Sequence, residues 1–240
     1  MDRGLYTAAT GMSIADLWIS TISNNLANAS TTGFKKDTLV FNEAFERSLN
    51  GSSGEIGEIG AGPAPYGSYS VWENGALSTT GNPLDIAVTN KTGAFKVRTE
   101  KGEFYSRNGA MALSPTGTLV TSTGAEVLDR NGSAITIPKG RVVISPQGHL
   151  SVNDVDIAQI GLYEGDFTKV GDGLFSATTV KEIDPKEVNI QQGFIEQSNV
   201  NVVEEMIAMI KLNRAFELAQ KSAQSEDEST QRLITILQGR

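Results

Sequence analysis

The stretch from Asn201 to Leu237 contains neither proline nor glycine, and it constrains the fold of this chain more than any other feature. Proline and glycine are the residues that most often end or weaken a helix, so an uninterrupted run of this length predicts one continuous helix. About 36 residues would make a helix of about 54 Å. Asn201 can cap the first turn, and Glu204 follows at the capping-box position.

Apolar and small side chains recur along this predicted helix at alternating steps of three and four residues, which is the heptad spacing of a coiled-coil seam. They are Val202, Met209, Leu212, Phe216, Ala219, Ala223, Leu233 and Leu237. The polar residues Glu205, Glu226 and Thr230 interrupt the seam. A seam of this length needs a partner, because burying apolar side chains away from water is favourable.

Residues 4–29 offer that partner, because they carry the same heptad spacing near the other end of the chain. One set of positions holds Leu5, Met12, Ile19 and Leu26, and the set three residues later holds Ala8, Ala15, Ile22 and Ala29. The alanines would let a partner backbone approach closely. Asn25 and Asn28 can satisfy terminal carbonyl groups or bridge to neighbouring elements, and Gly33 is a plausible stop signal.

The composition changes between the two predicted helices. Residues 34–49 fit a further helical or extended arm, and the Gly-rich residues 50–65 fit a flexible linker or loop. Residues 66–163 contain many short β-branched or alternating runs. Such runs with close turn signals predict a small antiparallel barrel or folded sheet.

Two further expectations concern the connections in this middle region. Asn-Gly pairs at 74–75, 108–109 and 131–132 are predicted hairpin turns. Residues 164–200 are expected to return toward the final helix, with residues 181–188 extended over the surface.

These segments together predict an α+β protein. Long N- and C-terminal helices would form a coiled-coil domain, with an inserted, mostly antiparallel β-domain. The predicted division places residues 1–33 together with 195–240 in the terminal helical domain. Residues 34–65 make the arm and the Gly-rich loop, and residues 66–194 make the β-domain with its return linker.

The charge and the composition exclude several classes of function. The net charge of −8 argues against non-specific binding of nucleic acid, which needs a basic surface. The absence of cysteine excludes disulfides, thiolate metal sites and a cysteine nucleophile. No apolar run is long enough for a membrane-spanning helix, and the first residues lack the apolar core of a secretory signal. The chain is therefore expected in the cytoplasm, or to leave it by a route without a cleaved signal.

The sequence offers little for catalysis. His149 is the single histidine, so it has no second imidazole for a metal site and would have to serve any Ser-His-Asp triad. The acidic residues Glu226, Asp227 and Glu228 fit a solvated helix face or salt bridges to a neighbouring helix. We predict no catalytic, metal or cofactor site. A hydrolase that uses an acidic pair or His149 as its base is kept as a hypothesis, although no feature of the sequence supports it.

Several short motifs stand out along the chain: residues 22–35 (ISNNLANASTTGFK), 75–85 (GALSTTGNPLD), 105–109 (YSRNG), 117–121 (GTLVT), 193–202 (GFIEQSNVNV) and 214–217 (RAFE). Together they resemble the motifs of bacterial flagellar rod and hook axial proteins. The opening MDRGLY resembles the rod members and favours a proximal-rod type over a distal-rod type. Residues 90–95 (NKTGAF) depart from the pattern, since the family usually has a Gly-x-Gly-Phe-Phe-type segment there.

This resemblance implies a non-enzymatic structural subunit of the flagellar basal-body rod, part of the drive shaft that crosses the periplasm. Its implied partners are copies of itself, other rod proteins and the flagellar type III export apparatus, which exports such subunits without signal cleavage. It implies no nucleic acid, small-molecule substrate or cofactor. The subunits would assemble helically through their terminal helices, with the β-domain outside them.

The predicted assembly interface lies on those helices. Its residues are Leu5, Met12, Ile19, Ile22, Leu26, Asn25, Asn28, Val202, Met209, Leu212, Phe216, Leu233 and Leu237. The final helix is longer than the N-terminal one, so we expect its end near Leu233 to contact another subunit. The alternative hypothesis is a cytoplasmic coiled-coil adaptor whose β-domain binds a peptide or protein.

Overall fold

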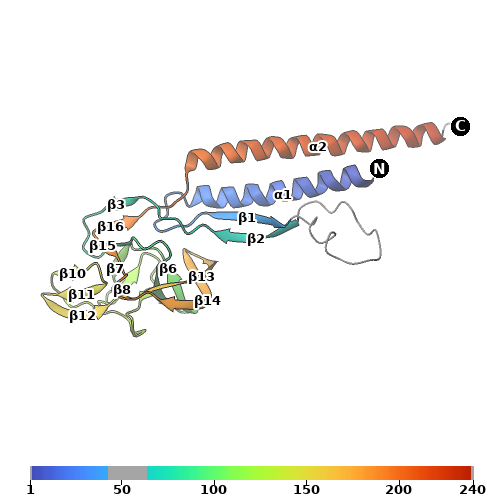
Figure 1. Cartoon of the computed structure of the whole chain (residues 1–240). Helices are drawn as coiled ribbons and strands as arrows, with labels where there is room; N and C mark the ends of the chain where they lie inside the picture. Colours follow the sequence, from blue (N-terminus) through green and yellow to red (C-terminus); the bar gives the residue numbers. More distant parts are fainter. Residues whose placement is uncertain (1, 43–63, 239–240) are drawn as a thin grey trace. The chain divides into compact units, whose positions relative to one another are not determined.

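The computed structural model describes residues 2–42 and 64–238, with side chains except those of residues 2–7, 41–42, 64–66, 230, 233 and 236–238. The helix α1 (Asp2–Ala27) opens this described part and the helix α2 (Val202–Gln238) closes it, with sixteen described strands between them in sequence (Figure 1). The class is therefore α+β, as predicted. Two compact units are present: a helical unit of Met1–Ala27, Asp37–Tyr69 and Asn201–Arg240, and a β-rich unit of Asn28–Lys36 and Ser70–Val200. The predicted three-part division stays a prediction beside these units.

The helical unit contains the two helices that the heptad spacing predicts, lying side by side (Figure 1). Asn201 caps α2 as expected, since its Oδ1 accepts hydrogen bonds from the N–H groups of Val203 at 3.1 Å and Glu204 at 3.4 Å. α2 has 37 residues against 26 in α1. The difference of eleven residues corresponds to about 16 Å of helix.

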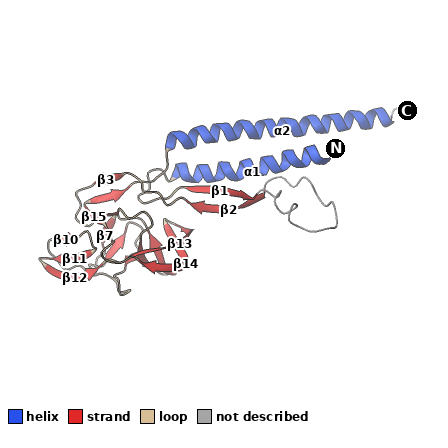
Figure 2. Ribbon diagram, in the orientation of Figure 1, coloured by secondary structure: helices blue, strands red, loops and turns tan. Residues whose placement is uncertain are grey.

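The helical unit also contains a two-stranded ribbon, in which β1 (Asp37–Asn42) pairs with β2 (Ala64–Ser70). The arm predicted after Gly33 is therefore extended over residues 37–42 rather than helical (Figure 2). Residues 43–49 of that arm and residues 50–63 of the Gly-rich segment lie outside the described residues.

The largest sheet of the β-rich unit has seven strands in the order β13-β14-β6-β5-β9-β8-β7, all paired antiparallel. Their bounds are β5 (Ala94–Thr99), β6 (Gly102–Ser106), β7 (Met111–Leu113), β8 (Leu119–Thr121), β9 (Glu126–Val127), β13 (Leu162–Gly171) and β14 (Leu174–Glu182). β13 also pairs with β5. The strands β5, β6, β14 and β13 therefore close into a ring, and of the two arrangements expected from the sequence, a small antiparallel barrel or a folded sheet, this is closer to the first.

Three smaller sheets complete the β-rich unit. β10 (Val142–Ile144), β11 (His149–Val152) and β12 (Val155–Gln159) form an antiparallel meander. β4 (Ile86–Val88) pairs with β15 (Ile190–Gln192), and β3 (Leu77–Thr79) pairs with β16 (Phe194–Glu196). The last two pairings join the beginning and the end of the unit. Its core is a continuous set of buried apolar side chains, among them Ile86, Phe95, Leu119, Leu150 and Leu162.

The sequence predicted the return of residues 164–200 toward α2 but not the long hairpin at the beginning of this segment. Most of β13 and all of β14 lie there, and they are the longest strands described. A tight turn joins them, where Asp172 and Gly173 adopt φ angles of 52° and 71°. The polar and glycine residues of LYEGDFTKVG hid this hairpin, because they break the apolar alternation by which strands are recognised.

Two of the three Asn-Gly hairpin turns are also predicted wrongly. Only the pair at 131–132 makes a turn, in which Gly132 has a φ of 81° and the N–H of Asp129 donates to the carbonyl of Ser133 at 2.8 Å. Gly75 and Gly109 serve close backbone packing instead. A Cβ at Gly109 would lie 1.6 Å from the carbonyl oxygen of Ile86, and one at Gly75 would lie 1.9 Å from that of Gln197.

Gly109→Ala should therefore destabilise the protein by about 3 kcal/mol, because the added methyl must push the β4 backbone aside. Gly11→Ala is the control, since a Cβ at this helical position meets nothing within 4 Å. It should raise stability by up to about 1 kcal/mol. Urea unfolding followed by circular dichroism measures both changes, and equal effects of the two substitutions would contradict the close approach.

Candidate assembly interface

On α1 the buried apolar side chains belong to the second of the two predicted heptad sets, the one that begins at Ala8. Ala8, Ala15 and Ile22, which are seven residues apart, are the buried apolar side chains of the described part of α1. Met12, Ile19 and Leu26, at the other predicted positions, are half-buried. The side chain of Leu5 lies outside the described residues.

On α2 the side chains of Met209, Leu212 and Phe216 are half-buried, together with Ala219 and Ala223. These five positions share one face of a helix, because their spacing follows the heptad repeat. Val202, predicted as part of the same seam, is 40% exposed. The side chains of Leu233 and Leu237 are not among those described.

Asn25 bridges three elements of the helical unit. Its Nδ2 donates to the carbonyl of Asp37 at 2.9 Å and lies 3.4 Å from Oε2 of Glu205, while its Oδ1 accepts from the N–H of Asp37 at 2.9 Å. The side chain is buried, and these bonds satisfy its amide. Of the two roles that the sequence left open for Asn25, the structure shows the bridge to neighbouring elements, and its place in the assembly interface stays a prediction. Asn28 instead shapes the turn after α1, where its Oδ1 accepts from Thr31 Oγ1 at 3.2 Å.

A second apolar stripe on α2 was missed by the sequence analysis. Val203, Met206, Ile207 and Ile210 are 60%, 44%, 48% and 54% exposed. Their spacing places them on the side of α2 opposite the seam residue Leu212. We call these four residues the outer stripe. The signal was present in the sequence, since eight of the eleven residues from Val202 to Leu212 are apolar, and a helix that is apolar all round is usually buried.

The β-rich unit contains a buried ionic centre that sequence reasoning also missed. The carboxylate of Glu196 lies between two cations: Oε1 is 2.7 Å from Nζ of Lys35, and Oε2 is 2.6 Å from Nε of Arg107. All three side chains are at most 1% exposed. Each comes from a different motif of the family resemblance, so the motifs carried a signal for the centre without showing that their residues meet.

Further hydrogen bonds satisfy both cations. Nη2 of Arg107 donates to the carbonyls of Val88 at 2.9 Å and Asn90 at 2.7 Å, and Nη1 donates to that of Gly93. Nζ of Lys35 donates to the carbonyl of Glu73 at 2.6 Å. No described buried side-chain nitrogen or oxygen lacks a partner. Each buried nitrogen and oxygen of the three side chains thus has at least one partner, as expected of a structural core.

Burial is the main influence on the pKa values of the two cations in this centre. It lowers the pKa of Lys35, the nearby charge of Arg107 lowers that pKa further, and Glu196 opposes both effects. Burial likewise lowers the pKa of Arg107. Because the folded pKa of Lys35 lies below its unfolded value, the unfolded chain binds more protons between the two values. Stability from this group therefore rises with pH across that window.

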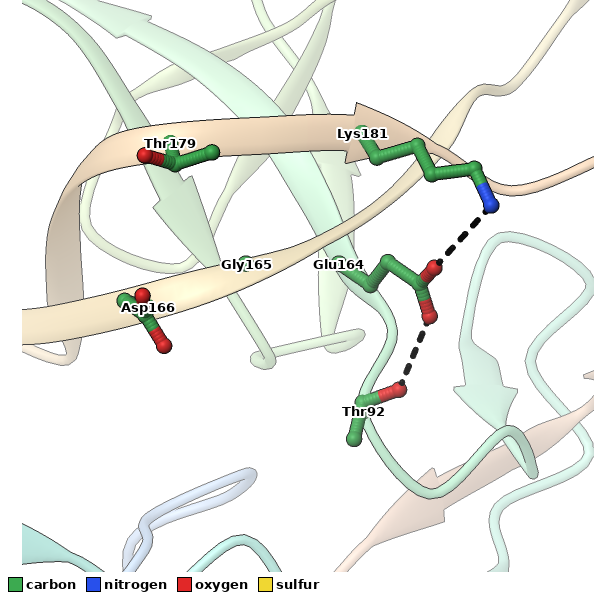
Figure 3. A pocket seen from close by; sticks show the side chains of 6 residues that line it. All are labelled: Thr92, Glu164, Gly165, Asp166, Thr179 and Lys181. Atoms are coloured by element: carbon green, nitrogen blue, oxygen red, sulfur yellow. Dashed lines mark hydrogen bonds and ion pairs between the residues drawn. The ribbon is translucent and has the colours of Figure 1, made fainter.

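A shallow hollow of about 320 Å³ on the β-rich unit offers no catalytic arrangement. In Figure 3 the side chains of Lys181 and Thr92 point toward Glu164, at 3.8 Å and 3.4 Å from its carboxylate oxygens. His149 is exposed at the start of β11, 3.4 Å from Asp156. The described residues hold no cluster of metal-ligating side chains. None of the described helices combines the length and apolarity needed to cross a membrane.

Glu196→Gln should lower the free energy of unfolding by about 3–5 kcal/mol, because it leaves two buried cations without their counter-charge. Glu103→Gln is a matched control. Glu103 also contacts one lysine and one arginine, Lys96 at 2.6 Å and Arg98 at 3.2 Å, but it is 44% exposed. The control should cost less than about 1 kcal/mol. Chemical denaturation measures both changes. If the two variants lost the same free energy of unfolding, burial of the ionic centre would not be the reason for the effect of Glu196→Gln.

Lys35→Met should flatten the pH dependence of stability. In the unsubstituted protein the Lys35 contribution rises as the pH climbs toward the ordinary lysine range, and methionine has no proton to release. The difference in unfolding free energy between the two proteins is measured at pH 7 and pH 10. The other titrating groups are common to both proteins, so a difference that does not change with pH would refute a lowered Lys35 pKa.

Comparison with known proteins agrees with the motifs. Three family models match: "Flagella basal body rod protein" over residues 5–35, "Flagellar hook protein FlgE/F/G D1 domain" over 87–161, and "Flagellar basal body rod FlgEFG protein C-terminal" over 191–236. The flagellar basal-body rod protein FlgF of Caulobacter vibrioides is 34% identical over 99% of this chain and 98% of its own length.

Other relatives are of both rod types. The FlgF protein of Rhizobium meliloti is 30% identical over 100% of this chain and 99% of its own length. The FlgG protein of Bacillus subtilis is 31% identical over 98% of this chain and 99% of its own length. The chain therefore belongs to the flagellar basal-body rod protein family, as a structural protein of the bacterial flagellar basal-body rod.

Proposed function

We propose that this chain is a non-enzymatic rod subunit that joins its neighbours through α1 and α2, which pair as a coiled coil. The outer stripe carries this proposal. One face of α2 bears the seam that pairs with α1, and the outer stripe lies on the opposite face. An exposed apolar stripe of this kind is typical of a surface that another protein covers.

The far end of α2 supports the same proposal. Ile234 lies eighteen residues, or five helical turns, after the seam residue Phe216, but it is 47% exposed, and α2 is eleven residues longer than α1. We infer that this end contacts another subunit, as the predicted interface at Leu233 and Leu237 requires. Two different apolar surfaces on one helix suit a head-to-tail contact. Such a contact does not close on itself, so it builds a helical array.

The partners follow from this role. Copies of the chain and other rod proteins would cover the apolar surfaces, and the type III export apparatus would deliver the chain across the membrane without signal cleavage. The β-rich unit is proposed as the inserted domain on the outside of the helical layer. Nothing in its described hollow or at His149 favours a hydrolase. The similarity to both FlgF and FlgG proteins leaves the proximal-rod type as a proposal.

A double substitution in the outer stripe tests this function. Ile207→Asp with Ile210→Asp should reduce incorporation into basal bodies at least tenfold, because each isoleucine buried on assembly contributes about 1.5–3 kcal/mol. Circular dichroism should show unchanged helix content. Gln220→Asp with Gln224→Asp is the control, since these exposed polar residues lie on the same helix.

The measurement is co-purification of the tagged chain with basal bodies from a flagellated bacterium that lacks its own copy. The unsubstituted chain should co-purify. If it stays in the cytoplasmic fraction, the adaptor hypothesis is favoured. If the outer-stripe variant co-purifies as well as the control, the stripe is not an assembly surface.

A further inference from the structure

The chain passes between the helical unit and the β-rich unit at four points, after residues 27, 36, 69 and 200. Three segments of the β-rich unit therefore lead to these points: residues 28–36, residues 70–75 and residues 196–200. We call them the connecting segments. Separate tethers would leave the units free to move, which is the usual behaviour of domains joined by small interfaces. The bonds among the connecting segments decide whether they behave separately.

Asn199 ties all three connecting segments together. Its Oδ1 accepts from the N–H of Lys36 at 2.7 Å, and its Nδ2 donates to the carbonyl of Val71 at 2.9 Å. The N–H of Val71 in turn donates to the carbonyl of Lys36 at 2.8 Å. One asparagine side chain therefore joins the segment after α1, the segment after β2 and the segment before α2.

The buried ionic centre connects the same segments a second time, through Glu196, which lies three residues before Asn199. Lys35 and Glu196 belong to two different connecting segments, and the two residues are 161 positions apart in the sequence. The carboxylate of Glu196 also accepts from the N–H of Gly75 at 2.8 Å, and its backbone carbonyl accepts from the N–H of Gly33 at 2.8 Å. A Cβ on Gly33 would lie 2.4 Å from the carbonyl oxygen of Arg107, so the first segment is packed directly against the β-rich unit.

The strand ring also contacts the connecting segments. Nζ of Lys169, on β13, donates to the carbonyl of Lys35 at 2.9 Å and lies 3.9 Å from the ring centroid of Phe34. The ring of Trp72, in the second connecting segment, packs at a tilt against those of Phe167 and Phe175, with centroids 4.7 Å and 5.0 Å away. The connecting segments are therefore fixed to each other and to the longest hairpin of the unit.

We propose that Glu196 and Asn199 are positioning residues that lock the three connecting segments into one rigid clamp, so that load on the terminal helices is passed to the β-rich unit as torque. A single tether transmits tension but swivels under rotation, whereas several segments bonded to one another resist it. This proposal rests on the rod function, because a rotating shaft is where resistance to swivelling matters.

Native-state hydrogen exchange on the full chain tests the clamp. In the unsubstituted protein the amides of Lys36, Val71 and Asn199 should exchange with the same denaturant dependence as the core amide of Leu119, because they open only when the whole unit unfolds. In Asn199→Ala and in Glu196→Gln the clamp amides should exchange at least tenfold faster than Leu119, with almost no denaturant dependence.

The controls separate a clamp from ordinary stabilisation. Asn189→Ala, at an exposed position, and Glu103→Gln should leave clamp and core amides exchanging together. A residue that merely stabilises the unit would speed the clamp amides and Leu119 equally and keep their common denaturant dependence. That result for Asn199→Ala, which removes no charge, would overturn the proposal. It would do so even if Glu196→Gln failed to fold.

A motility measurement tests the consequence for torque. The Asn199→Ala chain should co-purify with basal bodies as well as the unsubstituted chain. When the viscosity of the medium is raised, however, bacteria with the Asn199→Ala chain should lose at least twofold more swimming speed than bacteria with the unsubstituted chain. Equal loss of speed for the two chains would refute the torque role alone. Failure of the unsubstituted chain to co-purify would instead refute the rod function on which the proposal rests.

Discussion

The carboxylate of Glu196, held between the cations of Lys35 and Arg107, is the interaction on which the β-rich unit depends. Removing three charged groups from water is costly, and their attraction offsets that cost only when further hydrogen bonds satisfy the groups. Here backbone carbonyls accept from the two cations, and the N–H of Gly75 donates to the carboxylate. Because the three side chains come from distant parts of the sequence, the centre can form only when the beginning, the middle and the end of the unit have come together.

The helical unit follows a different principle. Its internal packing is made by small and apolar side chains such as Ala15 and Ile22, with Asn25 as the polar group that ties the helices to the β1–β2 ribbon. The outer stripe adds apolar surface that this packing does not use. A helix that keeps apolar residues on both faces over its first turns is suited to an assembly, whereas the acidic residues 226–228 farther along keep that part of α2 in water.

Much of the candidate interface could be predicted from sequence. Met209, Leu212 and Phe216 were found by their spacing, and Asn25 by its unusual place near a helix end. The outer stripe was missed because a heptad template selects one face and passes over the other. The ionic centre was missed because charged residues in motifs are usually exposed, and nothing in the local sequence shows that Lys35, Arg107 and Glu196 meet.

The sequence by itself determined the two helices, the cap at Asn201, the α+β class and the family, since periodicity, capping and motifs are local signals that survive without the fold. Only the tertiary structure decided the rest. Gly75 and Gly109 look like turn residues until the backbones of Gln197 and Ile86 approach them. The strands β13 and β14 become recognisable only through their antiparallel pairing. Such long-range contacts are fixed by the packing of the whole unit, so no local window of the sequence contains them.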